Sequence, residues 1–187
     1  MKVFGFAAWS GSGKTTMIEN LLPLLAGQGL RVSVIKHAHH AFDVDKPGKD
    51  SYRHRQAGAA EVLVSSAARW VLMHELHTEA EPELPQLIAR LSPCDLVLVE
   101  GFKLQPIPKL EIHRQATGSP LLHPGDPHIV AVATDARLDT RLPQFGLGDY
   151  PAIVRFMLDH LGLAQAAGRG REAASKGQVG DNPDHEA

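Results

Sequence analysis

VFGFAAWSGSGKTT, residues 3–16, decides the fold of this chain. An apolar run over residues 3–9 passes into a glycine-rich turn, and from Lys14 to Ala26 the apolar residues recur at near-helical spacing. The stretch therefore predicts a strand, a loop and a helix in that order.

That order is the context of a phosphate-binding loop. Such a loop needs glycines whose backbone N–H groups converge on phosphate, a lysine that neutralises charge, and a hydroxyl for Mg²⁺. The usual pattern, G-x-x-x-x-G-K-[ST], has its first glycine where this chain has Ala8, and a small residue suffices there because the later residues make the contacts. The expected nucleotide-binding residues are Gly11, Ser12, Gly13, Lys14, Thr15 and Thr16, with Lys14 also catalytic and Thr15 also a metal contact.

The rest of the chain extends this unit into an α/β fold. Gly27 and Gly29 end the first helix, and the β-branched run RVSVIK (31–36) predicts a second strand, parallel to the first through a right-handed crossover. Further helices are expected at 51–57, 82–91 and 150–161, further strands at 95–99, 109–113 and 129–133, and an antiparallel hairpin, attached to the sheet, from 61–65 and 69–76. We therefore expect a P-loop NTPase-like fold, with a mostly parallel sheet flanked by helices and an added hairpin.

Composition limits the possible functions. The 187 residues suit one domain, which we place at 1–163, followed by a disordered tail at 164–187 that has too few large apolar residues to form a core. A net charge of −2 gives no field that favours nucleic acid, and no apolar run is long enough for a signal peptide or a membrane span. The single cysteine, Cys94, cannot form an internal disulfide. We expect a cytoplasmic protein that binds neither nucleic acid nor membrane.

Two carboxylates outside the loop are candidates for metal binding and catalysis. Mg²⁺ beside a phosphate loop is held by the loop hydroxyl, phosphate oxygens, waters and usually one acidic side chain. Glu100, which closes the buried run DLVLV (95–99), is the expected metal residue. The loop 37–50 follows the second strand, and Asp45 within it is the expected residue for positioning water or completing the Mg²⁺ shell. The alternative for both is a solvated charge.

Asp135 gives a reason to prefer guanine. It follows the strand at 129–133, and a carboxylate accepts two hydrogen bonds from guanine N1–H and the N2 amine, a donor pair that adenine lacks. GTP with Mg²⁺ is therefore the expected ligand. Among the eleven histidines, His37, His39 and His40 suggest a metal site, but the single distant cysteine argues against structural zinc, and we favour a hydrogen bond to phosphate or to an anionic partner ligand.

Four segments together resemble one family. They are FAAWSGSGKTT (6–16), IKHAHHAFDVDKPGKDSYRHRQAGA (35–59), LVEGFK (98–103) and IVAVATD (129–135). Over about residues 3–162 the chain resembles the molybdopterin-guanine dinucleotide biosynthesis adaptor proteins, the MobB family. The second segment is long and unusual, which makes the resemblance more specific than a phosphate loop alone.

The resemblance implies a function as well as a fold. The family binds GTP with Mg²⁺, hydrolyses it weakly, and forms dimers. It works beside MobA, a guanylyltransferase that joins GMP to molybdopterin to give the guanine dinucleotide form of the molybdenum cofactor. The implied partners are therefore GTP, molybdopterin or the molybdenum cofactor, a MobA-type enzyme and a second copy of the chain. The resemblance extends to Ala8, because the family also has an alanine where the loop pattern has its first glycine. The resemblance further implies that Glu100 lies near the metal.

Other functions stay open from the sequence. A P-loop kinase of a small metabolite would carry an arginine-rich lid, but residues 137–148 contain only two arginines, Arg137 and Arg141, together with one proline and two glycines. A non-catalytic module could instead present GTP or a cofactor to a partner enzyme. Steady phosphate release would distinguish a catalytic GTPase from such a carrier. Trp70 in the expected hairpin is either a dimer contact or a core residue.

Overall fold

The computed structural model describes residues 1–38 and 42–164. They form two compact units. The sheet unit comprises residues 1–37 and 87–164, and the hairpin unit comprises Ala38–Gln86. The prediction of one folding domain over 1–163 stays a prediction, and the expected tail, apart from its first residue, lies outside the described residues.

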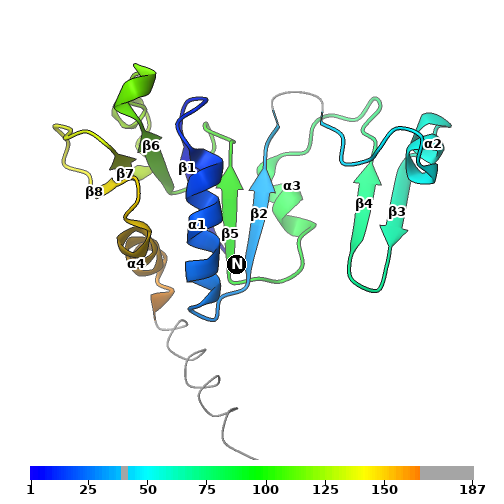
Figure 1. Cartoon of the computed structure of the whole chain (residues 1–187), viewed down its shortest axis with the longest axis horizontal. Coiled ribbons are helices and arrows are strands. Elements are labelled where there is room, and N and C mark those ends of the chain that lie inside the picture. The colour runs from blue at the N-terminus through cyan, green and yellow to red at the C-terminus, as the bar shows by residue number, and fades with distance from the viewer. Residues whose placement is uncertain (39–41, 165–187) are drawn as a thin grey trace, which may run out of the picture. The chain divides into compact units, whose positions relative to one another are not determined.

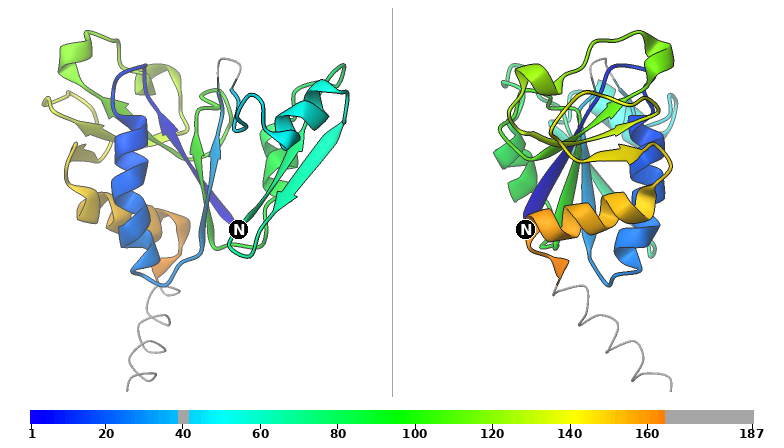
Figure 2. Two further views of the ribbon diagram at one scale, coloured as in Figure 1. Left: turned by 45° about the vertical axis from the view of Figure 1, so that its right-hand side comes forward. Right: turned by 90° about the vertical axis from the view of Figure 1, so that its left-hand side faces the viewer.

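The sheet unit is built on six strands that all run parallel, in the order β2-β5-β1-β6-β7-β8. The strands are β1 (Lys2–Ala7), β2 (Val32–Lys36), β5 (Leu96–Glu100), β6 (Lys109–His113), β7 (Ile129–Thr134) and β8 (Gln144–Gly146). Helix α1 (Lys14–Ala26) lies along one face of this sheet and packs against α4 (Tyr150–Leu161), as Figure 2 shows. Two short 3₁₀ helices, η1 (Gln115–Thr117) and η2 (His123–Gly125), lie between β6 and β7.

The core follows from the periodicity of the sequence. Every residue of β5 is buried, as expected for a parallel strand with both faces covered. Helix α1 buries Met17, Ile18, Leu21 and Leu25, spaced three and four apart, against the sheet. The helices predicted at 14–26 and 150–161 and the strand at 109–113 are confirmed to the residue, whereas the three-residue strand β8 is too short to give a pattern.

The direction of the strands decides where a ligand site can form. The carboxyl ends of β1, β2 and β5 meet at the same edge of the sheet, and the phosphate loop leaves β1 at that edge (Figure 1). In open parallel sheets the ligands bind at this edge, beyond the carboxyl ends of the strands. The loops that follow β5 and β6 also start there, so residues 101–108 and 114–125 can contribute to one site.

The hairpin unit has helix α2 (Asp50–Gln56) and strands β3 (Glu61–Ser65) and β4 (Trp70–His74). The predicted antiparallel hairpin is confirmed, with Leu63 opposite Leu72. Within the described residues β3 and β4 pair only with each other, so the hairpin forms its own sheet instead of extending the larger one. Alternation of apolar residues specifies the pairing of two strands, but not whether a further strand joins their edge.

The surface of the hairpin is unusually apolar. Leu63, Trp70 and Leu72 are 60%, 67% and 45% exposed, so Trp70 is not a core residue. Helix α3 (Leu84–Ala89) spans the boundary between the two units. Across the described part of the chain, every helix is too short or too polar to cross a membrane.

Candidate functional site

The backbone of the phosphate loop has the shape that anion binding needs. Gly11 and Gly13 have φ angles of 77° and 93°, in the left-handed region where a side chain would be strained. Helix α1 begins directly after Gly13, and within the described residues no side chain caps this end. Among the described residues, no side chain therefore satisfies the first amides of the helix, and the helix dipole adds positive potential. The loop therefore presents backbone N–H groups that a phosphate could bind in place of a capping side chain.

Lys14 is held in place by neutral groups. Its Nζ donates to the carbonyl oxygens of Ala8 and Trp9, both at 3.1 Å. Burial lowers the pKa of the Lys14 ammonium, and the charges of Lys103 and Lys36 lower it further, against an opposing effect of Glu100. No carboxylate in the described chain lies within ion-pair distance of this ammonium. Its charge is therefore available for an anion.

Thr15 and Glu100, the two residues expected to contact a metal, lie in contact with each other. The Thr15 hydroxyl donates to Glu100 Oε1 at 3.0 Å, and Lys36 Nζ lies 3.5 Å from the same oxygen. Parallel register explains the grouping, because Phe6, Lys36 and Glu100 lie side by side at the ends of three adjacent strands. A hydroxyl and a carboxylate beside a phosphate loop suit Mg²⁺, which prefers oxygen ligands. The residues present therefore fit the expected cation.

Asp135 lies past the end of β7 and is exposed. Its Oδ1 accepts a hydrogen bond from the Gln115 backbone N–H at 2.8 Å, and Oδ2 has no partner in the described part of the chain. Arg114 connects this region to the loop, because its Nη2 lies 3.7 Å from the position that a Cβ on Gly13 would take. One acceptor oxygen of Asp135 thus remains available at the β7 end of the site.

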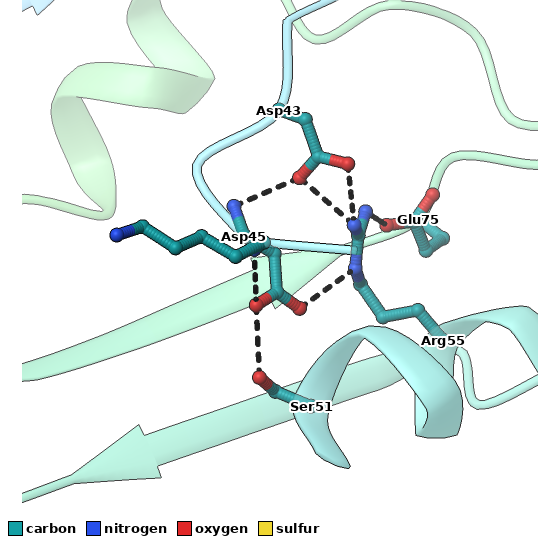
Figure 3. Close-up of polar contacts among 6 residues, drawn as sticks. Asp43, Asp45, Ser51, Arg55 and Glu75 are labelled. Carbon is teal, nitrogen blue, oxygen red and sulfur yellow. Dashed lines mark hydrogen bonds and ion pairs between the residues drawn. The ribbon is translucent and has the colours of Figure 1, made fainter. Parts of the chain in front are cut away.

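Asp45 belongs to the hairpin unit and contacts other residues of that unit. Figure 3 shows its carboxylate between Ser51 and Arg55. Asp45 Oδ1 accepts from Ser51 Oγ at 2.9 Å, and Oδ2 lies 3.5 Å from Arg55 Nε. The same guanidinium binds both oxygens of Asp43 and Oε1 of Glu75, all at 2.8 Å. The Asp45 N–H and then Arg55 hold the pKa of the Asp43 carboxyl below its ordinary value.

Sequence reasoning missed four residues of this edge: Trp9, Lys36, Lys103 and Arg114. Lys36 could have been found, because it ends the strand that parallel pairing places beside Glu100. Lys103 lies in the quoted segment LVEGFK, but nothing in its spacing shows where its side chain points. Of the three histidines singled out, His37 has its ring 4.7 Å from that of Phe102, and the other two lie outside the described residues.

Comparisons with known proteins agree with this geometry. The family model for MobB, described as "Molybdopterin guanine dinucleotide synthesis protein B", matches residues 3–135. The chain is 44% identical over 160 residues to the molybdopterin-guanine dinucleotide biosynthesis adapter protein of Escherichia coli K12, covering 84% of this chain and 91% of the relative. Its identity to the protein of the same name from Haemophilus influenzae is 42% over 157 residues, covering 83% and 86%.

Solved structures show the same fold. The crystal structure of Bacillus subtilis MobB superposes with a TM-score of 0.67 at 27% identity, covering 86% of this chain and 98% of that one. A crystal structure named molybdopterin-guanine biosynthesis protein B gives a TM-score of 0.66 at 26% identity, covering 85% and 99%. The likeness therefore extends over nearly the full length of both solved chains.

Proposed function

The chain belongs to the MobB family, and on that premise we propose that it binds GTP with Mg²⁺, hydrolyses it weakly, and acts as an adapter in molybdopterin guanine dinucleotide biosynthesis. The observation that carries the proposal is the arrangement of charge at the phosphate loop. Lys14 rests on carbonyl oxygens, and the hydroxyl of Thr15 meets the carboxylate of Glu100. A triphosphate with a bound divalent cation satisfies both groups at once.

Each residue of the site has a proposed role. The loop residues Gly11, Ser12, Gly13, Lys14, Thr15 and Thr16 hold the phosphates, mainly through backbone N–H groups and the lysine. Thr15 and Glu100 hold Mg²⁺, which neutralises phosphate charge when it is bound. Asp135 is the proposed acceptor of hydrogen bonds from the N1–H and the N2 amine of guanine, with Oδ2 available and Oδ1 also accepting from the Gln115 N–H. Asp45 is the proposed water-positioning residue.

The proposed partners follow from the pathway and from the surface. A MobA-type guanylyltransferase consumes the guanine nucleotide and molybdopterin, so an adapter that holds GTP would act beside it. A second copy of the chain is the proposed partner of the apolar hairpin, because exposed Leu63, Trp70 and Leu72 form a surface of the kind that interfaces bury. The kinase alternative has no support from residues 137–148, which contain strand β8 and no helix.

Calorimetric titration tests the proposal. The purified protein is titrated with non-hydrolysable analogues of GTP and ATP, each with and without Mg²⁺. We expect Mg²⁺-dependent binding of the GTP analogue and weak or no binding of the ATP analogue. A preference for the ATP analogue would instead support a small-molecule kinase.

Measurement of phosphate release from GTP then distinguishes a weak GTPase from a non-catalytic GTP carrier. A GTPase releases phosphate steadily over many turnovers, while a carrier stops at no more than one equivalent per site. We expect slow but continuous release. The same assay with a purified MobA-type enzyme present shows whether the partner changes the rate.

A further inference from the structure

The segment that follows β5 has an unusual backbone. Gly101 has φ +98°, and a Cβ there would lie 2.8 Å from the Cβ of His37. Phe102 has φ +49°, which is the left-handed region and is uncommon for a residue with a bulky side chain. Such conformations persist only where the surrounding structure fixes them, and they cluster at ligand sites. The next residue, Lys103, has no role in the proposed site so far.

A buried lysine fixes the backbone of this segment. Lys109 is 1% exposed, and its Nζ donates to the carbonyl oxygens of Lys103 at 2.9 Å and Gln105 at 2.7 Å. The same ammonium is paired with Asp126 Oδ2 at 2.7 Å. The main chain at Lys103 is therefore anchored through its carbonyl oxygen.

The side chain of Lys103 points to the phosphate loop. Its Nζ lies 4.7 Å from the centre of the Trp9 ring, and Trp9 is held in turn because its Nε1 donates to the Pro120 carbonyl at 2.8 Å. The charge of Lys103 also acts on the ammonium of Lys14, whose pKa it lowers. Two lysines thus approach Trp9, one at its carbonyl oxygen and the other over its ring.

The partners of the lysines at this edge differ in strength. Lys36 has a carboxylate, Glu100. Lys103 has only the face of an aromatic ring, with no carboxylate at ion-pair distance in the part of the chain that the structure covers. A cation over an aromatic ring at an accessible site is held weakly, whereas a lysine bound to phosphate makes a charge-assisted hydrogen bond. An incoming phosphate can therefore displace Trp9 as the partner of Lys103.

We propose that Lys103 is a second phosphate-binding lysine, which leaves the face of Trp9 and donates to the terminal phosphate of the bound nucleoside triphosphate. The inference rests on the proposed function. The terminal phosphate is favoured because Lys103 lies near Lys14, the residue type that reaches the β- and γ-phosphates. Asp135, the proposed base contact, follows β7, which is separated from β1 by β6. Lys103 thus distinguishes a triphosphate from a diphosphate.

Titration of matched variants tests this. Affinities for a non-hydrolysable GTP analogue and for GDP, both with Mg²⁺, are compared in the unaltered protein, Lys103→Met, Lys103→Arg and Lys2→Met. Lys2 is an exposed lysine at the other end of β1, so it controls for loss of one positive charge. Lys103→Met should weaken the triphosphate analogue about 10-fold and GDP less than about twofold, as expected for one charge-assisted hydrogen bond. Lys103→Arg should restore most of the preference, and Lys2→Met should keep it.

Fluorescence gives a second reading with Lys103 intact. Trp9 and Trp70 are the two tryptophans, so Trp70→Phe leaves Trp9 as the single reporter. Binding of the GTP analogue should change Trp9 emission, and the change should be lost when Lys103→Met is added. Equal losses for GDP and the analogue, an unchanged preference, or constant Trp9 emission on binding would each overturn the role of Lys103. If the unaltered protein binds neither nucleotide, the proposed function itself fails.

Discussion

Two groups of charged side chains differ in how their cations are paired. One group lies at the sheet edge beside the phosphate loop, and the other surrounds Arg55 in the hairpin unit. At the edge, Lys36 is paired with the carboxylate of Glu100, Lys14 rests on backbone carbonyl oxygens, and Lys103 lies over the ring of Trp9. In the hairpin unit, one guanidinium meets the carboxylates of Asp43, Asp45 and Glu75. Lys14 and Lys103, which contact carbonyl oxygens and an aromatic ring, can exchange these neutral partners for an anionic ligand. Arg55 already has three carboxylate partners, so an anionic ligand would add little binding energy. The first arrangement suits binding and the second suits stability.

The strongest test of this contrast is Lys14→Ala. We expect the affinity for the GTP analogue to fall at least about 100-fold, because the ammonium makes more than one charge-assisted contact to phosphate. The unfolding midpoint should stay within about 2 °C, since no buried carboxylate loses its partner. Calorimetric titration and thermal unfolding measure the two quantities. An unchanged affinity would remove the loop from the site.

Glu100→Gln tests the carboxylate that contacts Thr15. Glutamine can still accept the hydrogen bond of Thr15 but has no charge for a cation. The gain in GTP-analogue affinity that Mg²⁺ provides should fall about 10-fold, as expected for losing one charged interaction. Without Mg²⁺ the affinity should be equal or higher, because the loop edge has lost a negative charge. A Mg²⁺ effect of unaltered size would exclude Glu100 from the metal site.

Asp135→Asn tests base recognition with little change in shape. The amide oxygen can keep the hydrogen bond from Gln115, while the free carboxylate oxygen is replaced by an NH₂ donor. GTP-analogue affinity should fall about 10-fold, because a donor then faces a donor of guanine, and ATP-analogue affinity should change little. Equal losses for the two analogues would remove Asp135 from base recognition.

Much of the fold was predictable from the sequence. The boundaries of α1 and α4 came from apolar spacing and from the glycines at their ends, which are local signals. The strand β5 came from a continuous apolar run. Strand β8 and the independence of the hairpin were not predictable, because a three-residue strand has no period and an exposed strand edge leaves no mark in the sequence.

The site was predictable where a motif specifies geometry. Lys14, Thr15 and Glu100 lie together as expected, since a phosphate loop and the end of a neighbouring parallel strand share one edge. Contacts between distant loops carry no such signal, so the position of Lys103 over Trp9 was missed. For the same reason, the sequence suggested a catalytic role for Asp45 but gave no indication that Arg55 is its partner.

Asp45→Asn tests the other half of the contrast. The Asp45 side chain is 8% exposed, and the asparagine would place an NH₂ group or a neutral oxygen against the Arg55 Nε–H. The midpoint of urea unfolding should fall, because the substitution removes the negative charge that lies 3.5 Å from Arg55 Nε. Affinity for the GTP analogue should be unchanged. Urea unfolding and calorimetric titration measure the two effects.

Ser51→Ala is the matched control for Asp45→Asn. It removes the hydroxyl that donates to Asp45 Oδ1 but keeps the carboxylate. Both variants should lose stability, whereas only Asp45→Asn should slow GTP hydrolysis at saturating GTP if Asp45 also positions water. Equal hydrolysis rates in the two variants would leave Asp45 with a purely structural role.

The smallest expected effect is a pH dependence in the hairpin. His74 contacts Glu61 at 2.8 Å and Glu79 at 3.2 Å, and these carboxylates raise the pKa of His74 above its ordinary value of 6.5. Because the folded pKa lies above the unfolded one, the stabilisation is complete below about pH 6.5 and is lost as pH rises through the folded value.

Thermal unfolding from about pH 5.5 to about pH 9 measures this loss by comparing the unaltered protein with His74→Gln. The difference between the two unfolding midpoints should be largest at the acid end and shrink with rising pH, while nucleotide affinity stays the same in both. A difference that grows with pH would contradict the raised pKa. A parallel change in nucleotide affinity would instead break the contrast between a hairpin unit whose charges stabilise the fold and a sheet unit whose charges bind the ligand.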